Sequence, residues 1–204
     1  GAVCVATDRF AMRNQGQTGE ESLQVAMRVV QMAQEKGRSA QITIAGAFGC
    51  PFDGEVSPDR IVEMAQRAAQ VAPREVALAD TIGVASPRDV GMLVGRVATA
   101  IAPIPVRVHF HNTRNTGLAN VWAAVAAGAR TVDASIGGLG GCPFAPGAAG
   151  NVPTEDVVYM LERSGIATGL DLDRLIETSN WVSTVLGKTL AGMVSRAGPF
   201  PRAA

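Results

Sequence analysis

The chain has 204 residues, of which 47% are hydrophobic, 18% charged and 4% aromatic. This apolar content excludes a disordered chain and is enough for one substantial core. Eighteen basic residues balance eighteen acidic ones, which excludes the large cationic field typical of nucleic-acid binding, so we expect no nucleic-acid partner.

The cysteines Cys4, Cys50 and Cys142 are dispersed and odd in number, so a disulfide framework is not expected. No apolar run approaches the ~20 residues that cross a bilayer, and the opening segment GAVCVATDRF lacks the basic start of a signal peptide. These features predict a protein of the reducing cytoplasm without a membrane partner. Because the chain opens on Gly1 with a strand-like segment, we also expect that its N-terminus has been cut or processed.

Short apolar runs alternate with longer amphipathic segments along the chain, a pattern typical of repeated βα units. The apolar runs predict five strands, at residues 2–6, 41–46, 75–79, 106–111 and 131–136. Strands that alternate with helices predict a parallel sheet joined by right-handed crossovers. The predicted fold class is therefore α/β.

The helices between these strands have clear boundary signals. Thr18 and Glu21 form a T-x-x-E capping box, and Gly37 ends that helix. Ser57 and Ser86 each stand before a proline and are predicted to cap the next two helices. Further helices are expected at about 118–127, 154–165, 172–186 and 190–196, and the last two form a C-terminal extension because no strand follows them.

Polar residues gather directly after each predicted strand. They lie in the segments TDRF, GAFGCPFDG, ADTIG, HFHNT and SIGGLGGCPFAPGAAGN. In parallel α/β folds, ligands bind at the carboxyl ends of the strands. The five segments are therefore predicted to point at one site.

Both histidines of the chain, His109 and His111, stand two residues apart at the end of a predicted strand. Side chains two apart on a strand face the same way, so two imidazoles can converge on one ion. The alternative is a pair of satisfied polar residues at a strand end. We favour the metal site because these are the only two histidines, and the spacing fits several metals.

Three further side chains follow predicted strands, and each has two interpretations. Asp80 could bind substrate, move a proton or support metal ligands, or it could cap a turn. Cys142 lies in a run with four glycines, where a thiol can exchange protons with a ligand, or it is a buried thiol, as we expect for Cys4. For Cys50 both interpretations stay open. Asn151 stands just ahead of a helix and, taken alone, is interpreted as a turn or cap residue, although an amide oxygen can also bind a hard cation.

The segments HFHNT, ADTIGVA, SIGGLGGCPFAPGAAGN and TEDVVYML resemble the 3-hydroxy-3-methylglutaryl-CoA lyase family, a group of metal-dependent lyases on a TIM barrel. The glycine-rich segment around Cys142 is the most specific, because it is similar to the family signature S-V-A-G-L-G-G-C-P-Y, whereas the H-x-H strand is shared with Claisen-type synthases. The resemblance implies an incomplete (β/α)8 TIM barrel over residues 1–196, about strands four to eight, with 197–204 as a tail. A complete barrel usually has about 250 residues, so the length agrees with a missing N-terminal third.

The resemblance also implies roles for single residues. His109, His111 and Asn151 match the family's ligands for a divalent cation, Mg²⁺ or Mn²⁺, which reverses the cap interpretation of Asn151. Cys142 matches a cysteine implicated in proton transfer, and Asp80 matches an active-site aspartate. The implied reaction is the retro-Claisen cleavage of an acyl-CoA thioester, 3-hydroxy-3-methylglutaryl-CoA, to acetyl-CoA and acetoacetate. The family also suggests a homo-oligomer.

The chain departs from the family pattern at several positions. Asn112 stands where an aspartate is common, Ala77 where a small polar residue is common, and Arg114-Asn115 replaces a Y-G pair. The family's Arg-Asp-Gly run, whose aspartate is a metal ligand, has no equivalent here. Three alternatives therefore stay open: the lyase above, a lyase or Claisen-type synthase for another branched acyl-CoA, and an inactive fragment or non-catalytic partner.

Overall fold

The computed structural model describes residues 1–141 and 150–201, and within them five strands form one sheet. The strands are Ala2–Val5 (β1), Ile42–Ala45 (β2), Val76–Asp80 (β3), Val106–Phe110 (β4) and Thr131–Asp133 (β5). Each strand pairs in parallel with the next one along the chain. The predicted α/β class with a parallel sheet is confirmed, and a sheet whose spatial order equals its chain order is an arc of a (β/α)8 barrel.

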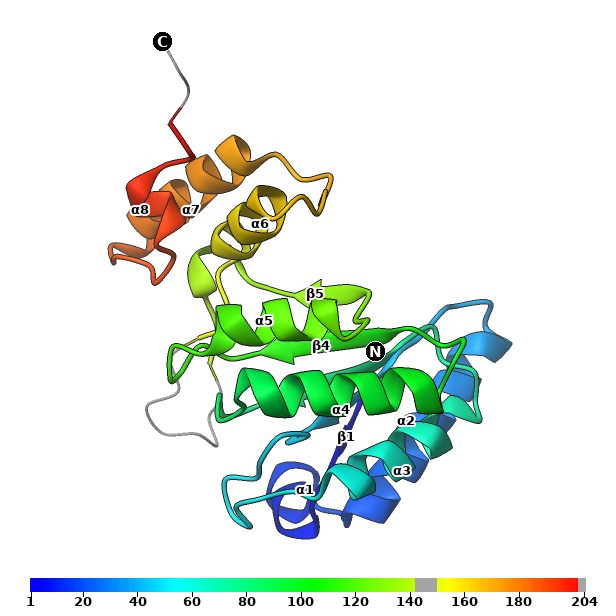
Figure 1. Cartoon of the computed structure of the whole chain (residues 1–204). Coiled ribbons are helices and arrows are strands. Elements are labelled where there is room, and N and C mark those ends of the chain that lie inside the picture. Colours follow the sequence, from blue (N-terminus) through cyan, green and yellow to red (C-terminus); the bar gives the residue numbers. More distant parts are fainter. Residues whose placement is uncertain (142–149, 202–204) are drawn as a thin grey trace.

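Helices cover one face of this arc and extend beyond its last strand (Figure 1). The helices associated with the strands are Asp8–Gln15 (α1), Gly19–Glu35 (α2), Pro58–Ala69 (α3), Pro87–Ala100 (α4) and Gly117–Ala126 (α5). After β5 come a 3₁₀ turn at Ile136–Gly138 (η1) and the helices Thr154–Arg163 (α6), Leu172–Leu186 (α7) and Val194–Ala197 (α8). Helices α6, α7 and α8 contact one another and form a separate group beyond β5 (Figure 1).

Strand alternation divides the sheet into a helix-facing side and an inner side. Cys4, Ile44, Leu78 and Val108 lie opposite one another across β1 to β4, and all four are fully buried. Burial raises the pKa of the Cys4 thiol to about 12, as expected for a structural cysteine. The alternate residues of each strand face inward, and this face is less covered by other elements. Val3 on β1, for example, is 50% exposed. The polar side chains of β4 and β5 lie on this inner face.

Helix α1 was not predicted from the sequence. The sequence analysis treated the first residues of this helix as part of a polar segment that follows a strand. Only Phe10 and Ala11 of this helix are buried, so its sequence lacks a long apolar stripe. Gly16 ends the helix in the left-handed conformation, with φ of 70°. A short helix fixed by one aromatic side chain gives too little periodicity to be recognised.

The C-terminal extension also contains less helix than predicted. Of the expected 190–196 helix only α8 forms, and the segment before it is bound to other elements. The backbone N–H of Ala191 donates to the carbonyl of Gly137, and those of Met193 and Val194 donate to the carboxylate of Asp156 on α6. Tertiary hydrogen bonds thus replace helical ones in this segment.

Two predicted serine caps differ in the structure. Ser86 forms a capping box with Asp89, whereas Ser57 makes no side-chain hydrogen bond at its helix start. Both precede a proline at the first helical position, so they form a matched pair. We expect Ser86→Ala to lower the free energy of unfolding by about 1 kcal/mol, and Ser57→Ala to change it by less than about 0.5 kcal/mol. Urea unfolding followed by circular dichroism measures both, and equal losses would contradict the cap assignment.

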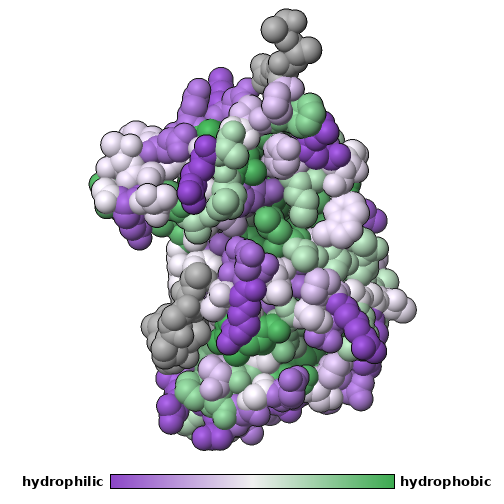
Figure 2. Space-filling view, turned by 60° about the vertical axis from the view of Figure 1, so that its left-hand side comes forward, coloured by the Kyte–Doolittle hydropathy of each residue, from purple (hydrophilic) through white to green (hydrophobic). Residues whose placement is uncertain are grey.

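The outer surface mixes hydrophobic and hydrophilic side chains in patches (Figure 2). Large exposed apolar side chains include Trp181 and Val185 of α7. In the described ranges, no helix is both long and apolar enough to span a bilayer.

Candidate metal centre

The two histidines lie on the inner face of β4 and at its carboxyl end. Val106, Val108 and Phe110 are buried against the helices, so the alternate residues of the strand point inward. The ring centroids of His109 and His111 are 5.3 Å apart. The prediction that both imidazoles face the same way agrees with this geometry.

Asn151 is brought to His111 by long-range pairing of the segment before α6. The backbone N–H of Val152 donates to the carbonyl of Phe110, and that of Asn112 donates to the carbonyl of Gly150. His111 and Asn151 consequently form an antiparallel bridge. The Nδ2 group of Asn151 donates to the carbonyl of Leu139 at 2.8 Å, so this side chain does not cap α6.

Within residues 1–141 and 150–201, two buried polar atoms at this bridge have no hydrogen-bond partner. They are Nδ1 of His111, whose residue is only 5% exposed, and Oδ1 of Asn151. Buried polar atoms are almost always satisfied, so an unpartnered nitrogen and an unpartnered amide oxygen on paired residues indicate a missing partner. A divalent cation binds both atom types. His109, His111 and Asn151 therefore fit the cation that the resemblance implies.

The electrostatics of His111 suit a metal ligand. Burial lowers the pKa of His111, and the neighbouring His109 lowers it further. A lowered pKa favours the neutral imidazole, which is the form that binds metals. None of the three side chains is a carboxylate, and among the described residues no group of three or more His, Cys, Asp and Glu side chains could hold a metal.

An aspartate that the sequence reasoning missed lies beside His109. Asp133 pairs in register with His109 across β4 and β5, and its Oδ2 is 3.7 Å from Nδ1 of His109. Arg107, also on the inner face of β4, binds the other carboxylate oxygen. Burial alone would raise the pKa of Asp133, but the contacts with His109 and Arg107 outweigh it and lower the pKa. The register of β5 against β4 places residue 133 in the row of His109, and the sequence alone does not give that register.

Asp80 lies on the other side of the sheet from the histidines. It pairs in register with Phe110, the residue between them, and it is fully buried. Its two oxygens accept from the backbone N–H groups of Val84 and Ala85, each at 3.0 Å. Burial raises the pKa of Asp80, although these amides act in the opposite direction. The expected shared mouth with the histidines is therefore corrected, and the geometry favours the turn-capping alternative; a catalytic role for Asp80 stays a prediction.

Two residues that depart from the family pattern have structural roles here. Nη1 of Arg114 donates to the carbonyls of Ile82 and Gly83, in the turn that Asp80 holds. Oδ1 of Asn112 accepts from the backbone N–H of Gly117 at the start of α5, at 3.0 Å. The turn after β3 is thus fixed by its own aspartate and by an arginine from the next loop.

The beginning of the glycine-rich segment is held by Glu155 of α6. This carboxylate is fully buried and accepts from the backbone N–H of Gly137 at 3.0 Å and from Oγ of Ser179 at 2.8 Å. Glu155 was not among the predicted site residues. Cys142 lies outside the described residues. Cys50 is buried, and Oγ1 of Thr7 lies 3.0 Å from its sulfur, which indicates a structural environment.

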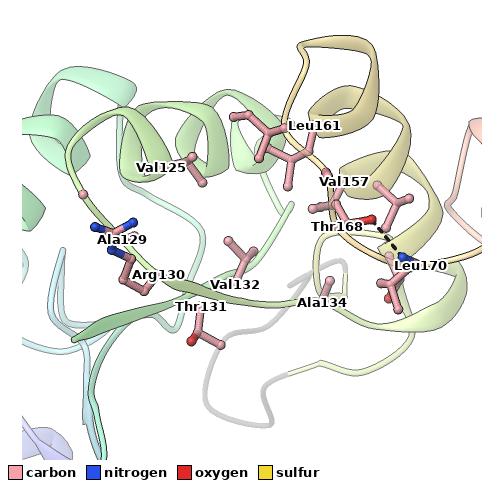
Figure 3. A pocket seen from close by; sticks show the side chains of 15 residues that line it. Val125, Ala129, Arg130, Thr131, Val132, Ala134, Val157, Leu161, Thr168 and Leu170 are labelled. Carbon is pink, nitrogen blue, oxygen red and sulfur yellow. Dashed lines mark hydrogen bonds between the residues drawn. The ribbon is translucent and has the colours of Figure 1, made fainter.

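A pocket of about 530 Å³ lies away from these side chains, between β5, α5 and α6 (Figure 3). It is lined mainly by apolar side chains, with Val125 from α5, Val132 from β5, and Val157 and Leu161 from α6. His109, His111 and Asn151 do not line this pocket. The candidate metal centre therefore lies on the inner face and not in this pocket.

Comparison with known proteins agrees with the fold. The profile of the HMGL-like family matches residues 2–182. The chain is 43% identical over 197 residues to the (R)-citramalyl-CoA lyase of Chloroflexus aurantiacus, covering 97% of this chain and 62% of that protein. It is 38% identical to the cytoplasmic 3-hydroxy-3-methylglutaryl-CoA lyase of Danio rerio, covering 94% of this chain and 57% of that protein.

Among solved structures, an HMG-CoA lyase from Acinetobacter baumannii in complex with coenzyme A and 3-methylmalate matches with a TM-score of 0.91 and 39% identity. The match covers 99% of this chain and 66% of that one. The chain thus spans 62% and 57% of the two curated relatives above. The predicted partial TIM barrel is confirmed by these neighbours, and the chain belongs to the HMGL-like family.

Proposed function

We propose that this chain forms the metal-holding part of an acyl-CoA lyase that cleaves 3-hydroxy-3-methylglutaryl-CoA, or a close analogue, to acetyl-CoA and a 3-oxo acid. The observation that carries the proposal is the pair of unpartnered buried atoms on His111 and Asn151, beside His109, in a chain of the HMGL-like family. The A. baumannii relative, solved with coenzyme A, supports a thioester substrate.

The chemistry at the site follows from the donors that face it. A divalent cation, Mg²⁺ or Mn²⁺, held by His109, His111 and Asn151 would act as a Lewis acid toward substrate oxygens. In the reaction the substrate's tertiary hydroxyl transfers its proton to a general base, a carbonyl forms at C3, and the bond between C2 and C3 breaks. The electron pair moves to the thioester's α-carbon, and the resulting enolate takes up a proton. Cys142, outside the described residues, is the proposed donor on the strength of the resemblance.

The acyl group is the finer part of the proposal. The Chloroflexus relative is a citramalyl-CoA lyase, so a lyase for another branched acyl-CoA is the second candidate, with the condensing synthase as its reverse-direction counterpart. The cytoplasmic location stays a prediction, because one relative is named as a cytoplasmic enzyme and another as a mitochondrial enzyme.

The test is product formation from a panel of acyl-CoA esters in the presence of Mn²⁺, with acetyl-CoA and the keto acid quantified by chromatography. We expect Mn²⁺-dependent release of acetyl-CoA from 3-hydroxy-3-methylglutaryl-CoA, in a protein that contains this chain and the remaining barrel strands. Turnover of citramalyl-CoA alone would move the assignment to the second candidate. Equal turnover with excess chelator would contradict both.

A third candidate is a non-catalytic chain that completes its barrel with another polypeptide. In residues 1–141 and 150–201, β1 and β5 each pair on one side only, and Val3 on β1 is half exposed. Open strand edges favour pairing with further strands. Intact-mass measurement, with sequencing of the coding region upstream of Gly1, distinguishes a longer protein from a separate partner.

A further inference from the structure

A histidine that binds a metal must present one ring nitrogen with a free lone pair, while the other nitrogen carries the proton. The proton-bearing nitrogen usually donates to a carboxylate or carbonyl, which fixes the ring and the tautomer. On the inner face of the sheet, the Nδ1 side of His109 faces Oδ2 of Asp133 at 3.7 Å. Nε2 lies at the opposite end of the same ring.

Asp133 is itself held in place by a network of inner-face side chains. Arg107 binds its Oδ1 atom, and Nε of Arg107 donates to Oε2 of Glu75 at 2.6 Å. Oγ1 of Thr131 donates to the other oxygen of Glu75 at 2.9 Å. The two oxygens of Asp133 therefore have separate partners, since Oδ1 faces the guanidinium and Oδ2 faces the imidazole.

We propose that Asp133 is a positioning residue for His109: its carboxylate, 3.7 Å from Nδ1, favours the tautomer with the proton on Nδ1 and so keeps Nε2 unprotonated and available to a metal ion. Arg107 keeps Asp133 in place and leaves Oδ2 free for this contact. The use of Nε2 as a ligand rests on the proposed function, whereas the effect on the tautomer does not depend on it.

The tautomer is measured in the metal-free chain by ¹⁵N nuclear magnetic resonance of the histidine rings, at about pH 8.5, where a free imidazole is neutral. The chain has two histidines, so His111→Gln identifies the signals of His109. We expect the Nδ1–H form in the wild type and a shift toward Nε2–H in Asp133→Ala. An Nε2–H form in the wild type, or no change in the variant, would overturn the proposal.

Two further variants separate positioning from stability. Glu75 contacts Arg107 but not His109, so Glu75→Gln weakens the same network away from the imidazole. In this variant the tautomer of His109 is expected to stay as in the wild type. Asp133→Asn keeps the shape of the side chain, but its single oxygen must serve either Arg107 or His109, so a mixed tautomer is expected. Equal effects of Glu75→Gln and Asp133→Ala would contradict a specific role of Asp133.

Mn²⁺ titration followed by electron paramagnetic resonance connects the tautomer to the metal. Loss of a carboxylate behind a metal-binding histidine typically weakens metal affinity by 10- to 100-fold, so we expect about this loss in Asp133→Ala and none in Glu75→Gln. Full Mn²⁺ affinity in Asp133→Ala would overturn the link to the metal. Absence of Mn²⁺ binding in the wild type would instead count against the proposed function, while the tautomer measurement would still decide the role of Asp133.

Discussion

Replacing His111 with alanine is expected to weaken Mn²⁺ binding at least about 100-fold, because removal of a direct ligand costs more than the 10- to 100-fold lost with a supporting partner. His111 supplies one of the two unpartnered buried atoms, and it is bridged to Asn151, which supplies the other. The variant therefore removes a donor and disturbs its neighbour. Mn²⁺ titration by electron paramagnetic resonance measures the loss.

Asn120 provides the control for this experiment. Its Oδ1 is also buried without a partner, but its Nδ2 donates to the carbonyl of Ala85, on the helix-facing side. Asn120→Ala should cost stability and leave Mn²⁺ affinity unchanged. Wild-type affinity in His111→Ala, or an equal loss in both variants, would show that these buried atoms do not mark a metal centre.

Replacing Gly150 with alanine is expected to destabilise the protein by about 3 kcal/mol, at the upper end of the range for overpacked positions. A Cβ at this position would lie 1.8 Å from the carbonyl oxygen of Gly138 and 2.7 Å from that of Gly140. Both are backbone atoms of the glycine-rich segment, so neither can move aside as a side chain would. Urea unfolding gives the free energy, and the same variant should also weaken Mn²⁺ binding because Asn151 is adjacent.

Gly95, inside α4, is the matched glycine. A Cβ there meets no atom within 4 Å, so Gly95→Ala should stabilise the helix by about 0.5–1 kcal/mol. A loss for Gly150→Ala below about 1 kcal/mol would mean that the segment before α6 adjusts freely.

The sequence was sufficient for the parts of the site that depend on local periodicity. Alternation along one strand placed His109 and His111 on the same face, and it needed no knowledge of the neighbouring strands. For Asp80 the same alternation gives the opposite face, because a shift of one residue along a strand reverses the face on which a side chain lies, and its catalytic role stays a prediction. The predicted strand ended at residue 79, whereas β3 ends at Asp80, opposite Phe110.

Residues whose roles depend on distant pairing could not be found from the sequence. Asp133 becomes relevant only when β5 is placed in register with β4, and Glu155 only when η1 and α7 are packed around it. The position of Asn151 depends on hydrogen bonds between its segment and the end of β4, more than 30 residues earlier. For Asn151 the predicted metal-ligand role came from the family resemblance, because its position in the sequence favoured only a turn or cap residue.

The inner row of the sheet has an uneven distribution of polarity. From β1 to β5 its members in register are Val5, Ala45, Ala79, His109 and Asp133. The first three present only hydrocarbon, whereas the last two carry a polar ring and a charge. A molecule bound along this row therefore has an apolar flank on one side and hydrogen-bonding groups on the other. In the proposed lyase, the order of the strands would therefore place the polar end of an acyl substrate toward β5 and its alkyl end toward β1.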